Sequence, residues 1–140
     1  MIKVKYTILR VAAMVSMVAA LFLAVTAATG AAASLQVESA VICEQVVDRE
    51  PVDIGSSFSA TIGKLYFYNK IVGAEGNTQV THVWYYGDTE RARVTLSVKA
   101  SNWRTYSSKR IQAHETGAWR AEVLDADGNT LATARFEVVK

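Results

Sequence analysis

The chain has 140 residues, enough for one domain, and 51% of them are hydrophobic. Lys and Arg total 15 against 13 Asp and Glu. This near balance disfavours nucleic acid as a partner. A single cysteine excludes an intramolecular disulfide, and two histidines without ligand spacing disfavour a metal site. No cofactor is expected.

The N-terminal segment has the three parts of a secretory signal peptide. The only charges before residue 34 are basic and lie near the start, an apolar run follows at 11–25, and small residues continue to Ala33. This pattern predicts cleavage after Ala33, which leaves Ser34 as the new N-terminus of a domain over 34–140. The protein would then be periplasmic or secreted. The alternative is an uncleaved anchor in the inner membrane formed by residues 11–33.

The first half of the expected domain has strand-like segments separated by turn residues. A strand over 37–47 holds Cys43, which we expect to be a buried small hydrophobe. A loop follows over 48–57. Residues 64–72 and 78–86 form two further strands, since apolar and aromatic side chains alternate in both.

The second half alternates more clearly. Residues 92–100, 119–123 and 132–138 place apolar side chains at every second position, which is typical of half-buried strands. The loop 125–129 contains Gly128 and predicts a C-terminal hairpin. We count about seven antiparallel strands, spaced as in an immunoglobulin-like β-sandwich.

Residues 102–110 depart from this pattern because they have no apolar face. If they alternate regularly, Trp103 and Ser107 share one side with Lys109, whereas Arg104 projects from the other. From residue 91 to 114 there are six cations and no acid, while the rest of the expected domain nets −7. A strand pair over 91–110 with a charge of +6 could attract an anionic partner. The alternative is an edge strand whose cations prevent aggregation.

Six residues are therefore candidates for ligand binding. Arg104 could bind an anion in bidentate fashion, Lys109 would add charge, and Ser107 would add a hydrogen bond beside Trp103. His82 and Trp84 point to one face of one strand and could shape a sugar site. The alternative for this last pair is a core tryptophan with a hydrogen-bonded histidine beside it.

Catalytic patterns are weak. Ser107 and Ser108 lack a glycine elbow, and pairing a serine with His82 or His114 rests on no spacing. The acidic loop 125–129 lacks the rest of an EF-hand, so a turn explains it.

Several spaced motifs nevertheless resemble a bacterial family, the domain of unknown function 2914. They are Asp48-Arg49-Glu50-Pro51, an aromatic strand at Tyr66-Phe67, His82-x-Trp84, Trp103-Arg104-x-Tyr106-Ser107-Ser108-Lys109, Gly117-x-Trp119, and Asp127-Gly128 followed by Phe136. The resemblance implies a prokaryotic source and a small β domain behind a signal or membrane segment. It implies no activity. The positions it singles out are His82, Trp84, Trp103, Arg104, Ser107, Lys109 and Trp119.

The expected function is a non-catalytic, exported binding or interaction module. Its partner would be a protein or an anionic glycan or polymer of the cell envelope, and it would contact the membrane only if the signal segment is uncleaved. Two alternatives stay open. One is a structural accessory subunit of an envelope complex, and the other is an enzyme acting on cell-wall or polysaccharide material.

Overall fold

Nine strands account for most of residues 35–140, the part of the chain that the computed structural model describes. No helix occurs among these residues, so none is available there to cross a membrane. The strands are β1 Gln36–Val47, β2 Glu50–Gly55, β3 Ser57–Ser59, β4 Lys64–Val72, β5 Thr78–Tyr86, β6 Thr89–Val98, β7 Asn102–Arg110, β8 Gly117–Leu124 and β9 Thr130–Val139.

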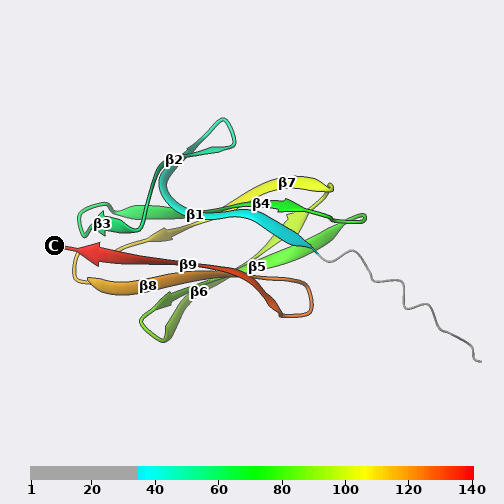
Figure 1. Ribbon diagram of the computed structural model, residues 1–140. Coiled ribbons are helices and arrows are strands. Elements are labelled where there is room, and N and C mark those ends of the chain that lie inside the picture. Colours follow the sequence, from blue (N-terminus) through cyan, green and yellow to red (C-terminus); the bar gives the residue numbers. More distant parts are fainter. Residues whose placement is uncertain (1–34) are drawn as a thin grey trace, which may run out of the picture. The chain divides into compact units, whose positions relative to one another are not determined.

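The strands form two sheets that pack face to face (Figure 1). The four-stranded sheet has the order β2-β1-β4-β7, and the five-stranded sheet has the order β3-β9-β8-β5-β6. All pairs are antiparallel except β3–β9, which is parallel. The all-β prediction is confirmed, with nine strands in place of about seven. The two extra strands are the short β2 and β3.

The core lies between the sheets, where the alternation of apolar side chains predicts it. Phe67 of β4 meets Trp84 of β5 edge-on, with ring centroids 6.2 Å apart. Trp84 meets Phe136 at 6.2 Å, and Phe136 stacks on Trp119 at 6.0 Å. All four rings are buried. The core alternative for Trp84 is therefore correct.

The predicted loop over 48–57 is wrong for most of its length. Asp48 and Arg49 form a two-residue turn with φ of 48° and 63°, and Val47 pairs with Glu50 across it. Positive φ at both central positions is the conformation that matches the twist of a tight hairpin. The chain then runs back along β1 as β2. In Figure 1 this β1–β2 hairpin rises from the four-stranded sheet on the side away from the five-stranded sheet.

The predicted strand pair over 91–110 is also wrong. Strand β6 pairs with β5 at the edge of the five-stranded sheet, whereas β7 pairs with β4 at the edge of the other sheet. The chain crosses from one sheet to the other between them. The cations of β6 and β7 therefore do not form one two-stranded surface.

Two other predictions concern the N-terminal part of the chain. Cys43 is buried as expected, and burial raises the pKa of its thiol, which favours the protonated, unreactive form. The signal segment over 1–33 and its cleavage between Ala33 and Ser34 lie outside the described residues.

Candidate functional site

Strand β7 has one row of side chains turned into the core and one turned to solvent. The inner row is Trp103, Thr105, Ser107 and Lys109, and the outer row is Arg104, Tyr106, Ser108 and Arg110. Thr105 and Ser107 are buried, while Arg104 and Arg110 are exposed. The pairing with β4 has no register shift, so Arg104 and Lys109 face opposite sides as expected. One small ligand cannot contact both.

The inner row explains why this strand lacks an apolar face. The Oγ of Ser107 lies 2.6 Å from Nδ1 of His82 and accepts a 3.0 Å hydrogen bond from Nε1 of Trp84. Nε2 of His82 lies 2.6 Å from Oδ1 of Asn69, whose Nδ2 donates to the carbonyl of Tyr68 at 2.9 Å. These residues come from β4, β5 and β7, so the chain of hydrogen bonds joins the two sheets.

The direction of every bond in this chain follows from its two ends. The indole of Trp84 can only donate, and the carbonyl of Tyr68 can only accept. Asn69 therefore presents its oxygen to His82, which must carry its proton on Nε2. Ser107 then donates to Nδ1. Burial lowers the pKa of His82 to about 3, so the ring is neutral at physiological pH.

Asn69, His82 and Ser107 are the residue types of a nucleophilic triad, but their surroundings differ from an active site. Ser107 is 8% exposed, and its oxygen is occupied by two core side chains. A substrate could reach it only if the sheets separated. Each side chain in this series of hydrogen bonds has a partner for its polar atoms, which makes the arrangement a stabilising buried network.

The outer row of β7 lies beside outward side chains of β4, and we call these two rows the outer face. Its cross-strand pairs are Lys70 with Arg104, Tyr68 with Tyr106, Tyr66 with Ser108, and Lys64 with Arg110. A pair of cations therefore stands at each end, with tyrosines between. Lys70 binds Glu38 at 2.8 Å and Arg104 binds Glu50 at 2.9 Å.

The tip of the β1–β2 hairpin leans over one end of the outer face. The hydroxyl of Tyr68 donates to the carbonyl of Arg49 at 2.9 Å, and the Arg104–Glu50 ion pair lies beside this bond. Burial, followed by the charge of Glu50, raises the pKa of Tyr68, so the phenol keeps the proton that it donates. These two contacts tie the tip to the sheet.

A groove of about 470 Å³ opens between the hairpin tip and β7. We call it the Arg49–Arg104 groove, and its lining residues are Arg49, Ala100, Asn102, Trp103, Arg104 and Tyr106. Two guanidinium groups, one amide and two aromatic side chains suit a ligand with a carboxylate, sulfate or phosphate. Its lining contains two arginines and no acidic residue.

The structure separates the predicted site residues into three groups. Arg104 and Trp103 line the groove. Ser107, His82 and Trp84 lie in the buried network. Lys109 stands apart, 6.0 Å from the Trp119 ring centroid and bonded to the carbonyl of Arg110.

Sequence reasoning missed Arg49 and Tyr106. Tyr106 shares the outer row with Arg104, so alternation alone could have found it. Arg49 reaches the groove because it lies in the hairpin turn. The sequence Asp48-Arg49 does not indicate a tight turn, since it contains no glycine or asparagine.

The remaining cations of the basic stretch have internal partners or face elsewhere. Arg91 pairs with the buried Glu115 at 3.2 Å, and Arg93 pairs with Glu90 at 2.6 Å. Both arginines lie on β6. Within residues 35–140, no group of three or more His, Cys, Asp or Glu side chains could hold a metal ion.

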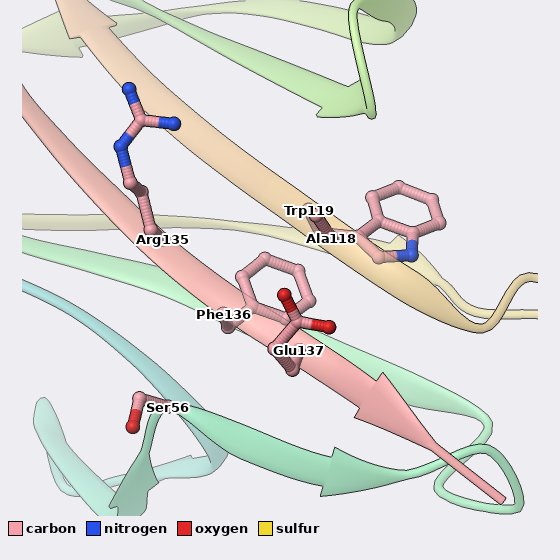
Figure 2. Close-up of a pocket in the computed structure, with 6 residues that line it drawn as sticks. All are labelled: Ser56, Ala118, Trp119, Arg135, Phe136 and Glu137. Carbon is pink, nitrogen blue, oxygen red and sulfur yellow. The ribbon is translucent and has the colours of Figure 1, made fainter.

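A second hollow of about 330 Å³ lies on the five-stranded sheet (Figure 2). Figure 2 shows Trp119 and Phe136 extending from neighbouring strands, with Ser56 on the segment beside β9. Arg135 and Glu137 bring opposite charges to it. It contains none of the predicted ligand-binding residues, and its balanced charge gives no preference for an anion.

Comparison with known proteins gives a family resemblance and remote likenesses to solved structures. Residues 77–138 match the family described as "Protein of unknown function (DUF2914)", which confirms the expected resemblance over β5 to β9. The motifs at 48–51 and 66–67 lie outside this match. The GH3 β-glucosidase of Bifidobacterium adolescentis is similar over 75% of this chain, with 8% identity and a TM-score of 0.43. The chain spans 17% of that enzyme's length. No curated protein matches the sequence.

Proposed function

We propose that residues 34–140 form an exported, immunoglobulin-like domain that binds an anionic group in the Arg49–Arg104 groove without catalysing a reaction. The observation that carries this proposal is the Arg104–Glu50 ion pair at 2.9 Å. It shows a carboxylate bound to the guanidinium of Arg104, which lines the groove and is the residue that the sequence favours most. A ligand carboxylate, sulfate or phosphate would replace Glu50 there and gain Arg49 as a second cation.

The immunoglobulin-like assignment is supported by the strand order. Strands β1, β4 and β7 correspond to A, B and E of one sheet, and β5, β6, β8 and β9 to C, C′, F and G of the other. Trp84 then occupies strand C, where immunoglobulin domains hold a buried tryptophan. The conserved disulfide of antibody domains has no counterpart, since Cys43 is the only cysteine.

Export is supported by the first 33 residues, whose basic start, apolar middle and small-residue end are those of a cleaved signal. We propose a periplasmic or secreted domain, with anchoring by residues 11–33 as the alternative. N-terminal sequencing of the exported protein tests this, and Ser34 is the expected first residue. A full-length species in the inner membrane would contradict the soluble form.

The binding proposal is tested with polygalacturonate as an anionic probe and protein produced from the full sequence. Arg104→Gln should weaken binding by about tenfold to a hundredfold, because a hydrogen bond to a charged group contributes about 1.5–3 kcal/mol. Binding by the wild type should weaken as salt rises, since exposed charges are screened. Circular dichroism checks that each variant is folded.

Arg93→Gln is the matched control. Arg93 is also an exposed arginine paired to a glutamate, but it lies on β6 in the other sheet. The Arg93→Gln variant should therefore bind polygalacturonate with unchanged affinity. Glu50→Gln should tighten binding, because Arg104 loses its internal competitor. Equal affinities for Arg104→Gln and the wild type at low salt would refute the groove as the site.

One observation favours the accessory-subunit alternative. Val47, Val52 and Ile54, all on the β1–β2 hairpin, are 48%, 36% and 57% exposed. Exposed apolar side chains gathered on one hairpin suit a protein partner. Co-purification of a protein at fixed stoichiometry, lost on Ile54→Asp, would support that function. The enzyme alternative has no comparable feature in residues 35–140, since Ser107 and His82 are buried.

A further inference from the structure

The end of the outer face remote from the groove has two cations without a carboxylate partner among residues 35–140. Lys64 and Arg110 are direct cross-strand neighbours, both exposed. Among residues 35–140 no carboxylate lies within 4.0 Å of either side chain. Lys64 rests 5.3 Å from the centroid of the Tyr66 ring. Like charges placed directly opposite one another destabilise a sheet, so fold stability does not account for this pair.

The side chains between the two ends form a continuous strip. Arg104 and Arg110 are six residues apart on β7, which corresponds to about 20 Å along the strand. Tyr106, 48% exposed, and Ser108 lie between them in the same row. Tyr66 meets Tyr106 edge-on at 5.9 Å. The strip therefore offers cations at both ends and aromatic and hydroxyl groups in the middle.

We propose that this strip binds an acidic polysaccharide chain that runs along β7 from the Arg49–Arg104 groove to Lys64 and Arg110. The inference rests on the proposed function and names the ligand class of the same site. One acidic sugar occupies the groove, and another further along the chain reaches Lys64 and Arg110. The sugar rings between them pack their C–H faces on Tyr106 and Tyr66, and their hydroxyls reach Ser108.

The tyrosines favour a glycan over other polyanions. A polyphosphate would gain from the cations but has no ring to place on an aromatic side chain. A sugar chain uses both features, since a tyrosine ring combines an apolar body with a polar hydroxyl. An exposed aromatic side chain between cations has little purpose in a surface that recognises charge alone.

The test compares galacturonate dimers with hexamers, using protein produced from the full sequence. The dimer should bind in the groove only, whereas the hexamer should bind about tenfold tighter or more, because its second contact is intramolecular. The double variant Lys64→Gln/Arg110→Gln should lose this gain and keep the affinity for the dimer. Arg104→Gln should weaken both. A double variant that binds the hexamer as the wild type does would overturn the inference and leave the groove intact.

A second comparison tests the ligand class. Tyr66→Ser, at a position of the outer face outside the groove lining, should weaken binding of the galacturonate hexamer and leave binding of linear polyphosphate unchanged. Equal loss for both probes, or no loss for either, would overturn the assignment to a glycan. If neither galacturonate binds and Arg104→Gln changes nothing, the proposed function itself fails.

Discussion

At the scale of single residues, the most informative group is the hydrogen-bonded chain from Trp84 to Asn69. It gives Ser107 and His82 partners inside the core, where an unpaired polar group would cost about 1–3 kcal/mol. It also crosses between the sheets, so it fixes how β5 sits against β4 and β7. The network therefore gives a structural role to residues that the sequence alone suggests for a ligand-binding site.

Because His82 is neutral in the folded protein, we can predict how the free energy of unfolding depends on pH. The folded pKa of about 3 lies below the value of 6.5 expected for an unfolded chain, so only the unfolded state takes up this proton as pH falls. The free energy of unfolding should therefore fall as pH drops below 6.5, with a slope that approaches about 1.4 kcal/mol per pH unit once the unfolded histidine is fully protonated. Urea unfolding between pH 6.5 and 5 measures this slope, while most carboxylates remain ionised.

The His82 ring provides the decisive control in this experiment. Its NMR signals should stay at the neutral position down to pH 4. A His82 titration midpoint between pH 6 and 7 would contradict the buried, neutral imidazole.

Part of this arrangement could be predicted from the sequence, and part could not. Burial of Trp84 and Trp119 and a hydrogen-bonded His82 could be expected, because aromatic side chains at alternating positions of a strand face the core. The partners of His82 could not, since Asn69 and Ser107 lie 13 and 25 residues away and meet it only when the sheets pack. The opposite faces of Arg104 and Lys109 followed from alternation alone.

At the scale of elements, the β1–β2 hairpin combines backbone strain with part of the proposed binding groove. The three non-glycine residues with positive φ among residues 35–140 are Asp48, Arg49 and Asp53, and all lie in this hairpin. Left-handed backbone costs about 1–2 kcal/mol for an ordinary side chain. Such strain persists where the surrounding structure enforces it, which is common at binding sites. Arg49 is strained where it lines the groove.

Arg49→Gly should separate stability from binding. Glycine adopts the φ of 63° without a steric penalty, so the free energy of unfolding should rise by up to about 1 kcal/mol. The same change removes a groove cation, so affinity for polygalacturonate should fall. Thermal unfolding and a binding titration on one preparation measure both effects.

Asp53→Gly is the control for that variant. Asp53 has φ of 57° and lies outside the groove lining. Its replacement should leave affinity unchanged, with a smaller gain in stability because aspartate tolerates this conformation better than arginine. Loss of binding in both variants would show that hairpin geometry, and not the Arg49 charge, governs the groove.

The hairpin also marks where sequence reasoning failed at this scale. Strands β4 and β5 were predicted with their observed bounds because their apolar and aromatic side chains alternate, interrupted in the inner rows only by Asn69 and His82. Residues 48–57 contain Pro51, Gly55 and several acids, which is the composition of a loop. Tertiary contacts overrode this local preference for a loop, since Tyr68 and Arg104 hold the tip of the hairpin against the sheet.

At the scale of the folded domain, the basic residues that cluster in the sequence are distributed between the two sheets. The six cations between residues 91 and 114 were expected on one strand pair, but β6 and β7 are edges of opposite sheets. Arg91 and Arg93 of β6 have glutamate partners, as Arg104 of β7 does, so the cations of these two strands without a carboxylate partner among the described residues are Lys109 and Arg110 of β7. The basic surface that remains combines β7 with β4 and the hairpin. Pairing of strands distant in sequence, which composition does not reveal, brings these residues together.

We propose that anions bind at the groove and outer face and not elsewhere on the domain. An NMR titration of the uniformly labelled protein with the galacturonate hexamer tests it most directly, because every backbone amide reports at once. We expect shifts at 48–50, 100–106 and 108–110, with the β6 amides of 91–97 unchanged. Shifts centred on β6, or on the hollow around Arg135 and Glu137, would contradict it.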